Sequence, residues 1–311
     1  MTDIVNGTKS HLDPTNRQIH AEDVYKIYPG RGGPKTVLDN VDLRIARGEF
    51  IALVGPSGCG KSTLLKLILG SEEPSMGKLL LDGETIEPPD PTRGIVDQKY
   101  ALFPNLTVLE NIMLGDRLSL SFFEWHRRKA EIREKAIEYL ATAQLEDHLY
   151  KYPQELSGGQ QQRAAVIQAL VRNPKVLLMD EPFGALDPGT RVRMQTFLLK
   201  KWEETGKTIV FVTHDLEEAI FLATRVVVLS QYYTDDRGNG VQRGSRVVCD
   251  MKTGSIGQAA SSKSKEDPKF MQTIGHVRQF VLKPDHAWHL KQFDLAHPDS
   301  FHTPALGEVK Q

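Results

Sequence analysis

The chain has 311 residues, of which 40% are hydrophobic and 25% charged, and its 39 lysines and arginines nearly balance 40 aspartates and glutamates, giving a formal net charge of -1. This is the composition of an ordinary folded protein, and the near-neutral charge argues against a nucleic-acid-binding surface. The length suggests about two domains. Two cysteines, Cys59 and Cys249, cannot form a disulfide framework, which predicts a reducing, cytosolic compartment.

The N-terminal residues are polar. Residues 1–12 lack the apolar core of a signal peptide, and residues 1–17 as a whole are expected to form a flexible arm. No uninterrupted apolar stretch approaches the roughly 18 residues that a membrane span requires. If the protein works at a membrane, we therefore expect another chain to cross it.

The next part of the chain is strand-like. Residues 37–45 alternate imperfectly between apolar and polar side chains, as a half-buried strand would. An apolar run at residues 50–54 then leads into a glycine-rich loop, and residues 63–69 are helix formers. Residues 78–81 predict a further strand that ends in a turn.

The glycine-rich loop fits the phosphate-loop pattern G-x-x-x-x-G-K-[ST] at every fixed position, in the strand–loop–helix context that the pattern requires. Glycines let successive backbone N–H groups point inward around anionic oxygens, and the helix that follows adds its positive end. Lys61 is expected to reach the β- and γ-phosphates, and the Ser62 hydroxyl to ligate Mg²⁺. We therefore expect nucleoside triphosphate binding here, rather than a mere surface turn. The residues concerned are Gly55, Pro56, Ser57, Gly58, Cys59, Gly60, Lys61, Ser62 and Thr63.

The middle of the chain predicts a helical insertion followed by alternating strands and helices. Residues 94–98 predict a short strand, and helix formers dominate residues 107–145. Three continuous apolar runs, at residues 176–179, 208–212 and 225–229, are typical of strands buried on both faces of a parallel sheet. Helical segments separate these runs, which is the α/β pattern.

Two carboxylates close the first of these runs. Because Asp180 and Glu181 end a buried strand, we expect them at the carboxyl edge of the sheet, beside the phosphate loop. Asp180 suits Mg²⁺, directly or through water, and Glu181 is placed to polarise an attacking water as a general base. The alternative is a pair of strand-terminal acids that only solvate a turn.

The sequence becomes more polar beyond residue 230. Residues 255–266 are typical of a linker, and residues 268–281 could form one amphipathic helix. Four histidines, at positions 286, 289, 297 and 302, have no spacing that argues for a metal, so a solvated tail is favoured over a metal site. No motif assigns a role to residues 232–311.

Five motifs occur in the order typical of one family. They are the phosphate loop, Leu-Ser-Gly-Gly-Gln at residues 156–160, the apolar run closed by Asp180 and Glu181, Ala-Leu-Asp at residues 185–187 and Thr-His-Asp at residues 213–215. Together they resemble the ATP-binding subunit of an ABC transporter over about residues 19–231. Three further stretches resemble the nitrate/sulfonate/taurine importer branch, at residues 28–33, 103–111 and 181–187.

The resemblance implies roles for individual residues. Tyr28 would stack on adenine, unless it is only a core tyrosine near a loop. Gln98 would touch the metal or the attacking water and sense the membrane subunit, while His214 would contact the γ-phosphate and orient Glu181. Asp187 would cross a dimer interface. The residues that would hold the γ-phosphate of ATP bound to a second copy, at a helix N-terminus, are Ser157, Gly158 and Gly159, and Gln160 is expected to belong to the same nucleotide-binding site.

The fold implied is α/β, with a P-loop NTPase core that has a mostly parallel sheet and an antiparallel β subdomain. A helical subdomain is expected to be inserted between Gln98 and Ser157. The expected domains are an arm at residues 1–17, an ATPase domain at residues 18–231 with its helical subdomain at about residues 100–165, and an extension at residues 232–311.

The function implied is that of an ATP-hydrolysing motor subunit of an importer at the cytoplasmic face of the cell membrane, with ATP and Mg²⁺ as cofactors. Its partners would be a second copy in a head-to-tail dimer, a membrane permease subunit and, indirectly, an extracytoplasmic solute-binding protein. The solute would be nitrate, a sulfonate, taurine or a related nitrogen or sulfur compound.

Two alternatives stay open. One is a soluble ABC ATPase of repair or translation, which often has two nucleotide domains or a long coiled-coil insertion. The other is a non-hydrolysing nucleotide-sensing scaffold, which would have no need for Glu181. The chain departs from the family at Asp97, where an aromatic residue commonly precedes the glutamine.

Overall fold

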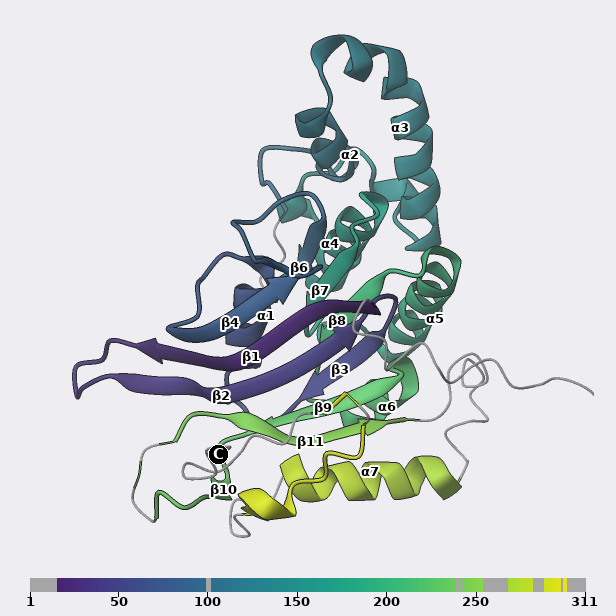
Figure 1. Cartoon of the computed structure of the whole chain (residues 1–311). Helices are drawn as coiled ribbons and strands as arrows, with labels where there is room; N and C mark the ends of the chain where they lie inside the picture. Colours follow the sequence, from purple (N-terminus) through teal and green to yellow (C-terminus); the bar gives the residue numbers. More distant parts are fainter. Residues whose placement is uncertain are drawn as a thin grey trace, which may run out of the picture. The chain divides into compact units, whose positions relative to one another are not determined.

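The computed structural model describes residues 16–98, 102–238, 241, 243–253, 268–281, 288–297 and 299–300. The chain divides into two compact units, of which the first comprises Met1–Pro89 with Thr208–Gln311 and the second Asp90–Lys207 (Figure 1). Among the described residues, no helix is both long enough and apolar enough to span a bilayer. Most of the expected N-terminal arm lies outside the described residues, and Arg17 already begins a strand.

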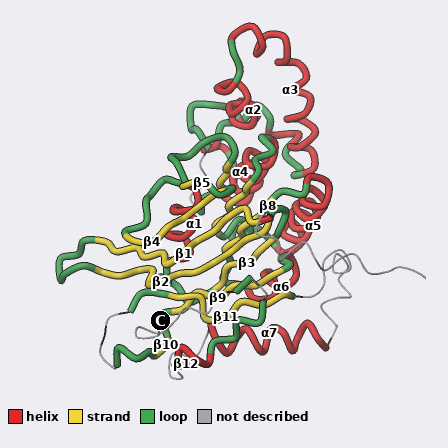
Figure 2. Tube along the Cα trace, viewed as in Figure 1, coloured by secondary structure: helices red, strands yellow, loops and turns green. Residues whose placement is uncertain are grey.

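The first unit contains a four-stranded antiparallel sheet in the order β2-β1-β4-β5, coloured yellow with the other strands in Figure 2. The alternation predicted at residues 37–45 is present from Val41 to Ile45 but fails at Asp39 and Asn40, which are both buried. Asn40 has a φ of 56°, and the pairing there advances two residues along β1 and three along β2, so a bulge interrupts the alternation. The strands are β1 (Arg17–Tyr28), β2 (Lys35–Ala46), β4 (Met76–Leu81) and β5 (Glu84–Thr85).

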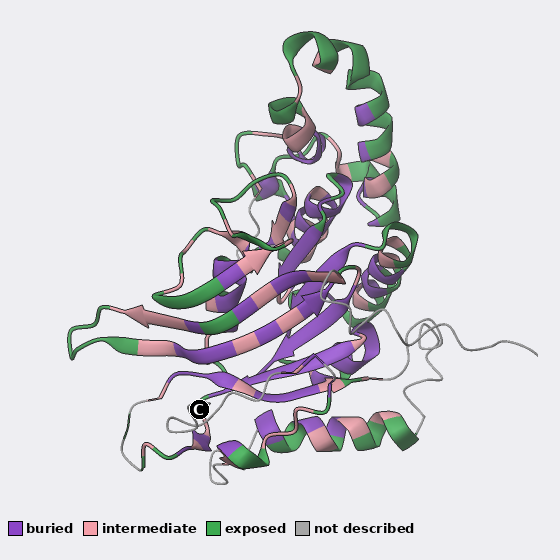
Figure 3. Cartoon of the chain, in the orientation of Figure 1, coloured by how far each residue is buried: buried purple, intermediate pink, exposed green. Residues whose placement is uncertain are grey.

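Parallel strands form the centre of the first unit. β3 (Phe50–Val54) lies between β8 (Thr208–Val212) and β9 (Arg225–Ser230) and runs parallel to both. Every residue of these three strands is buried, as Figure 3 shows in purple. The prediction of strands buried on both faces is therefore confirmed for the runs in this unit. Helix α1 (Lys61–Leu69) follows β3, and α6 (Leu216–Leu222) follows β8.

Residues beyond 230 extend this sheet and cover it. β11 (Arg246–Lys252) pairs antiparallel with β9. The predicted amphipathic helix is confirmed as α7 (Pro268–Val281), which packs against α6, β9 and β11 and buries Ile274 and Val277. β10 (Tyr233–Thr234) pairs with β12 (Trp288–His289), and a short 3-10 helix, Leu290–Gln292, follows.

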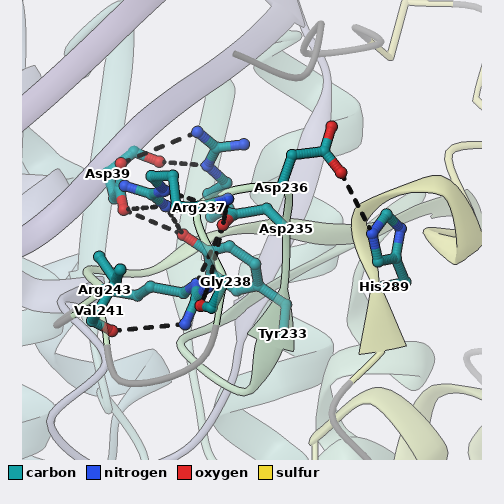
Figure 4. Close-up of polar contacts among 10 residues, drawn as sticks. Asp39, Tyr233, Asp235, Asp236, Arg237, Gly238, Val241, Arg243 and His289 are labelled. Carbon is teal, nitrogen blue, oxygen red and sulfur yellow. Dashed lines mark hydrogen bonds and ion pairs between the residues drawn. The ribbon is translucent and has the colours of Figure 1, made fainter. Parts of the chain in front are cut away.

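The expectation of a solvated tail is wrong for one of the four histidines. His297 is only 4% exposed. Its Nδ1 accepts the backbone N–H of Asp299 at 3.0 Å, and its Nε2 lies 3.9 Å from Glu49 Oε1. His289 is 40% exposed, with Nε2 3.6 Å from Asp236 Oδ1 (Figure 4), while positions 286 and 302 lie outside the described residues.

A cluster of charges joins the residues after β9 to β2 (Figure 4). Asp39 accepts hydrogen bonds from the Tyr233 hydroxyl at 3.1 Å and from Arg237 at 2.7 Å. Arg237 and Arg243 also donate to Asp235. Burial alone would raise the pKa of Asp235, but these two guanidinium groups hold it well below its usual range. The buried position of Asp39 in β2 is thus explained by partners about two hundred residues away.

A second charge network lies inside the first unit, centred on Arg225. The guanidinium donates to both carboxylate oxygens of Asp250 at 2.6 Å, to Glu49 at 3.2 Å and to the carbonyl of Arg44 at 2.8 Å. The side chains of Arg225, Asp250 and Glu49 are 1%, 2% and 7% exposed. This network ties β9 to β11 and to the turn before β3.

Arg225→Met is expected to lower the free energy of unfolding by about 3–5 kcal/mol, because it leaves two carboxylates buried without their cation. Urea denaturation followed by circular dichroism measures the effect. Arg128→Met is the control, since the Arg128 side chain is 45% exposed and its loss should change stability by no more than about 0.5 kcal/mol. A loss below about 1 kcal/mol for Arg225→Met would contradict the role given to the network.

The second unit combines a pair of parallel strands with helices. β6 (Arg93–Val96) pairs with β7 (Val176–Asp180), which contains the first of the predicted apolar runs. The helical insertion predicted at residues 107–145 consists of α2 (Val108–Ser119) and α3 (Phe122–Thr142), which pack against each other. Both begin with a capping box, built on Thr107 and on Ser121. The remaining helices are the 3-10 turns Glu146–His148 and Pro153–Glu155, α4 (Gly158–Val171) and α5 (Pro188–Thr205).

Candidate active site

The phosphate loop lies between β3 and α1 in the first unit, as predicted. Gly55, Gly58 and Gly60 have φ angles of 153°, 76° and 94°, which side chains rarely adopt. A Cβ on Gly55 would lie 2.1 Å from the carbonyl oxygen of Leu229, so the loop also needs glycine for space. The exposed residues of the loop and of the helix start are Ser57, Gly58 and Ser62. An anion can therefore reach the backbone N–H groups at the start of α1.

The two side chains at the back of this loop are buried. Lys61 is 8% exposed, and its Nζ donates to the carbonyls of Gly55 at 2.8 Å and Pro56 at 3.0 Å. Burial raises the pKa of the Cys59 thiol, although the Lys61 ammonium 3.8 Å away opposes the shift. The loop thus holds its lysine against its own carbonyls, within reach of any phosphate that enters.

Tyr28, at the end of β1, lies beside the first turn of α1. Its half-buried side chain donates a hydrogen bond to Glu72 at 2.5 Å and also interacts with the side chain of Thr63. The predicted adenine-stacking residue and the phosphate-loop helix are therefore neighbours in the same unit.

His214 is exposed in the turn between β8 and α6. The turn is fixed by its neighbours: Thr213 donates to Glu218 at 2.6 Å, and the carboxylate of Asp215 accepts the backbone N–H groups of Glu217 and Glu218. This arrangement presents the histidine at the carboxyl end of a buried strand.

In the second unit, Asp180 ends β7 and Glu181 follows it with a φ of 49°. This conformation is uncommon outside glycine and is a feature of strained functional turns. The exposed Gln98, which follows β6, donates its amide N–H to Glu181 Oε2 at 3.3 Å. The structure therefore brings together two of the residues predicted to act on water and metal.

Sequence reasoning missed Gln162. Its side chain is 2% exposed and clamps the turn after β7, donating to the backbone carbonyl of Glu181 at 3.0 Å and accepting the backbone N–H of Ala185 at 3.0 Å. The only signal in the sequence is a polar glutamine on the face of the predicted helix that packs against the core. Gln162 supports the backbone on which Glu181 stands.

The Leu-Ser-Gly-Gly-Gln signature forms the start of α4. Ser157 caps the helix, and its backbone N–H donates to Gln160 Oε1 at 2.8 Å while its hydroxyl accepts the N–H of Gln160 at 3.3 Å. Gln160 also contacts His148 at 2.7 Å, so its amide is engaged within the unit. Gly158 is exposed and a Cβ there would meet no atom within 4 Å, whereas one on Gly159 would lie 3.3 Å from the carbonyl of Ala185.

Asp187 caps α5. Its carboxylate accepts the backbone N–H of Thr190 at 3.0 Å, and hydrogen bonds from Thr190 hold its pKa below the usual range. The residue is exposed, which leaves it accessible to another chain.

The predicted residues thus fall into one group in each unit. In the first unit they are Tyr28, Gly55, Pro56, Ser57, Gly58, Cys59, Gly60, Lys61, Ser62, Thr63 and His214; in the second they are Gln98, Ser157, Gly158, Gly159, Gln160, Asp180, Glu181 and Asp187. A phosphate loop followed by a helix, together with acidic residues at the end of a buried strand, defines a P-loop nucleoside triphosphatase.

Comparisons with known proteins agree with this identification of a P-loop nucleoside triphosphatase. The ABC transporter family model matches residues 38–184. The aliphatic sulfonates import ATP-binding protein SsuB of Bacillus cereus is 42% identical over 212 residues, covering 68% of this chain and 81% of that protein. The bicarbonate transport ATP-binding protein CmpD of a Synechocystis species is 43% identical over 212 residues, 67% and 73% of the two chains.

A solved structure is similar as well. The dimeric structure of MJ0796, a bacterial ABC transporter cassette, is matched with a TM-score of 0.65 and 34% identity, covering 76% of this chain and all of that one. This chain therefore belongs to the ATP-binding proteins of the ABC transporter family. The resemblance and the fold class predicted from the sequence are confirmed.

Proposed function

We propose that this chain is the ATP-hydrolysing motor subunit of an importer, working at the cytoplasmic face of the membrane. Its relatives are named as import or transport ATP-binding proteins, for sulfonates, bicarbonate and glycine betaine, carnitine or choline. These names favour an importer over a repair or translation ATPase. The MJ0796 cassette bound to ADP and Pi in a post-hydrolysis state favours hydrolysis over nucleotide sensing.

The solute is proposed at the level of chemical class. The sulfonate relatives support a sulfonate such as taurine. Nitrate or a related nitrogen or sulfur compound is proposed from the resemblance of the sequence motifs. The residues of this chain make no contact with the solute in such a system, since selection belongs to a permease and an extracytoplasmic solute-binding protein, the two further partners proposed.

The observation that carries the proposal is the open N-terminus of α4. Ser157 caps it and Gly158 lies exposed with free space around it, yet the four residues 157–160 carry no cation to bind an anion alone. Such an end suits a phosphate already held by another protein surface. We assign that phosphate to ATP in the phosphate loop of a second copy, so that two copies related head to tail enclose two ATP molecules. The dimer of MJ0796 supports this assembly.

The residue roles that we propose are those implied by the family resemblance. Tyr28 stacks on adenine, and residues 55–63 cradle the triphosphate, with Lys61 on the β- and γ-phosphates. Glu181 takes the proton of the attacking water, while His214 contacts the γ-phosphate. Asp187 contacts the second copy. Loss of the γ-phosphate then removes the contacts that hold the copies together, which opens the dimer.

Mg²⁺ is the proposed metal, and its chemistry is to neutralise charge on the triphosphate. The donors fit this hard cation because they are oxygens: the Ser62 hydroxyl, the Asp180 carboxylate and the Gln98 amide oxygen. Gln98 donates its N–H to Glu181, so its carbonyl oxygen is the atom that can face the metal.

A cavity of about 560 Å³ between α2 and α3 is the proposed docking site of the permease. Phe122 and Tyr150 on its wall are 71% and 67% exposed, which suits a protein partner. The cationic side chains that line it outnumber the single acid, Glu110. We expect a short permease helix with apolar and acidic residues; the cations are Arg117, Lys129 and Arg133.

The experiment is ATP hydrolysis by this chain reconstituted with its permease and solute-binding protein in proteoliposomes. We expect hydrolysis and uptake that the correct solute stimulates and that Lys61→Ala reduces at least about 100-fold by removing charge stabilisation. Hydrolysis by the chain without any co-purifying permease, unaffected by all candidate solutes, would contradict the importer function.

A further inference from the structure

A compact set of contacts surrounds Tyr28 in the first unit. The Tyr28 hydroxyl donates to Glu72 Oε2 at 2.5 Å. The Lys26 ammonium lies 3.0 Å from the same carboxylate oxygen and 5.0 Å from the centre of the Tyr28 ring. It also donates to the backbone carbonyl of Glu73 at 2.8 Å. The tyrosine ring is thus held at its hydroxyl end and covered by a cation.

Glu72 lies just beyond the end of the phosphate-loop helix. Helix α1 ends at Leu69 and is capped by Gly70, two residues before Glu72. Lys66, in the last turn of α1, lies 3.5 Å from Glu72 Oε1. Glu72 therefore connects the end of β1, which carries Tyr28, to the helix whose other end is the phosphate loop.

The protonation states suit this link. Burial alone would raise the pKa of Glu72, but hydrogen bonds from Tyr28 and Lys26 lower it below the usual range, so the carboxylate stays ionised at neutral pH. Burial and the neighbouring Glu72 raise the pKa of Tyr28, so its hydroxyl keeps the proton that it donates. The bond is charge-assisted, and such bonds are stronger than those between neutral groups.

We propose that Glu72 is a positioning residue for the nucleotide base. It fixes the Tyr28 ring through the hydroxyl, and because the Lys26 ammonium covers one face of the ring, only the opposite face is offered to adenine. Glu72 does not touch the nucleotide; it acts through Tyr28. The inference rests on the proposed role of Tyr28 in stacking on adenine.

The physical reason is the cost of orienting a side chain at the moment of binding. A tyrosine that is free to rotate must lose that freedom when a base stacks on it, whereas a tethered ring has lost it already. Stacking on an aromatic ring changes affinity by about one to two orders of magnitude. Loss of the hydrogen bond between Tyr28 and Glu72 should therefore remove part of the affinity that stacking provides, lowering the affinity for ATP about three- to tenfold.

The test measures KM for ATP and kcat, together with the inhibition constant of inorganic tripolyphosphate, which has no base. The variants are Tyr28→Ala, Tyr28→Phe, Glu72→Ala and the double variant Tyr28→Phe with Glu72→Ala. Glu73→Ala is the matched control, because this neighbouring residue contacts Lys26 through its backbone carbonyl, which the substitution keeps. Glu72→Gln keeps an acceptor for the tyrosine hydroxyl.

We expect Tyr28→Phe and Glu72→Ala each to raise KM for ATP about three- to tenfold, with kcat changed less than about twofold. KM for ATP in the double variant should be no higher than in the single variant with the higher KM, since both single substitutions remove the hydrogen bond between Tyr28 and Glu72. Glu72→Gln should recover most of the loss, and Glu73→Ala should resemble the unmodified chain. The inhibition constant of tripolyphosphate should be the same in all variants.

Other outcomes overturn the inference in distinguishable ways. If Tyr28→Ala leaves KM unchanged, the stacking role of Tyr28 is wrong and the inference fails with it. If Tyr28→Ala raises KM about tenfold or more while Tyr28→Phe and Glu72→Ala do not, Tyr28 still stacks but Glu72 does not position it. If Glu72→Ala weakens tripolyphosphate inhibition as much as ATP binding, Glu72 acts on the phosphate loop through α1 instead.

Discussion

Glu181→Gln is expected to lower the rate of ATP hydrolysis by about 100- to 10,000-fold, because an amide cannot take the proton of the attacking water. The shape of the turn should survive. Gln162 holds the backbone carbonyl at position 181, and glutamine can still accept the hydrogen bond from Gln98. The positive φ at position 181 is equally unfavourable for glutamate and for glutamine, so the substitution adds no backbone strain.

Phosphate release at saturating ATP measures this effect. ATP binding should be retained, since the phosphate loop lies in the first unit and is untouched. Glu203→Gln is the matched control, because this glutamate lies exposed in α5. The control variant should hydrolyse ATP at the rate of the unmodified chain. Residual activity within about tenfold of the unmodified chain would show that another group, with His214 the first candidate, supplies the base.

Gly158→Asp is expected to abolish ATP-dependent dimerisation, raising the dissociation constant of the dimer by about 100-fold or more. The new carboxylate would meet the γ-phosphate of the second copy's ATP, and like charges brought together across an interface cost several kcal/mol. The chain itself should fold normally, since a Cβ at this position meets no atom within 4 Å and Gly158 has an ordinary helical position at the start of α4.

Sedimentation of the variant in the Glu181→Gln background, with ATP, tests the effect. Gly275→Asp is the matched control, because this helical glycine in α7 is also surrounded by open space. The Gly158→Asp chain should still bind ATP as a monomer, with unchanged stability to urea. If Gly158→Asp dimerises as well as the control, the N-terminus of α4 does not contact the nucleotide of the second copy.

Much of the fold was predictable because its signals are local. The phosphate loop, the buried runs and the helix at residues 268–281 each depend on a short pattern of glycine, apolar or helix-forming residues, and all three were found where expected. The acids Asp180 and Glu181 were also predictable, since they directly follow a buried strand.

The parts that escaped prediction depend on partners far apart in the sequence. Asp39 is a polar residue among the apolar positions of an alternating strand, and the partners that allow its burial, Tyr233 and Arg237, lie about two hundred residues away. His297 looks like part of a polar tail, yet it is buried near Glu49. Such pairings leave no periodicity to detect.

In the candidate site, too, some features could be predicted from local sequence and others could not. The identity of its residues follows from motifs, whereas their supports do not. No motif marks Gln162 behind Glu181 or Glu72 behind Tyr28, because each acts through side-chain contacts to residues distant in the sequence. Gln160, predicted to bind nucleotide, instead has its amide engaged by Ser157 and His148, and its contact with ATP stays a prediction.

The proposed motor depends on ATP joining two copies of this chain. Sedimentation of Glu181→Gln with ATP, with ADP and without nucleotide tests it most directly. We predict a dimer with ATP that holds two nucleotides, and monomers in the other two conditions. A chain that binds ATP and remains monomeric, alone and alongside its permease, would contradict the account.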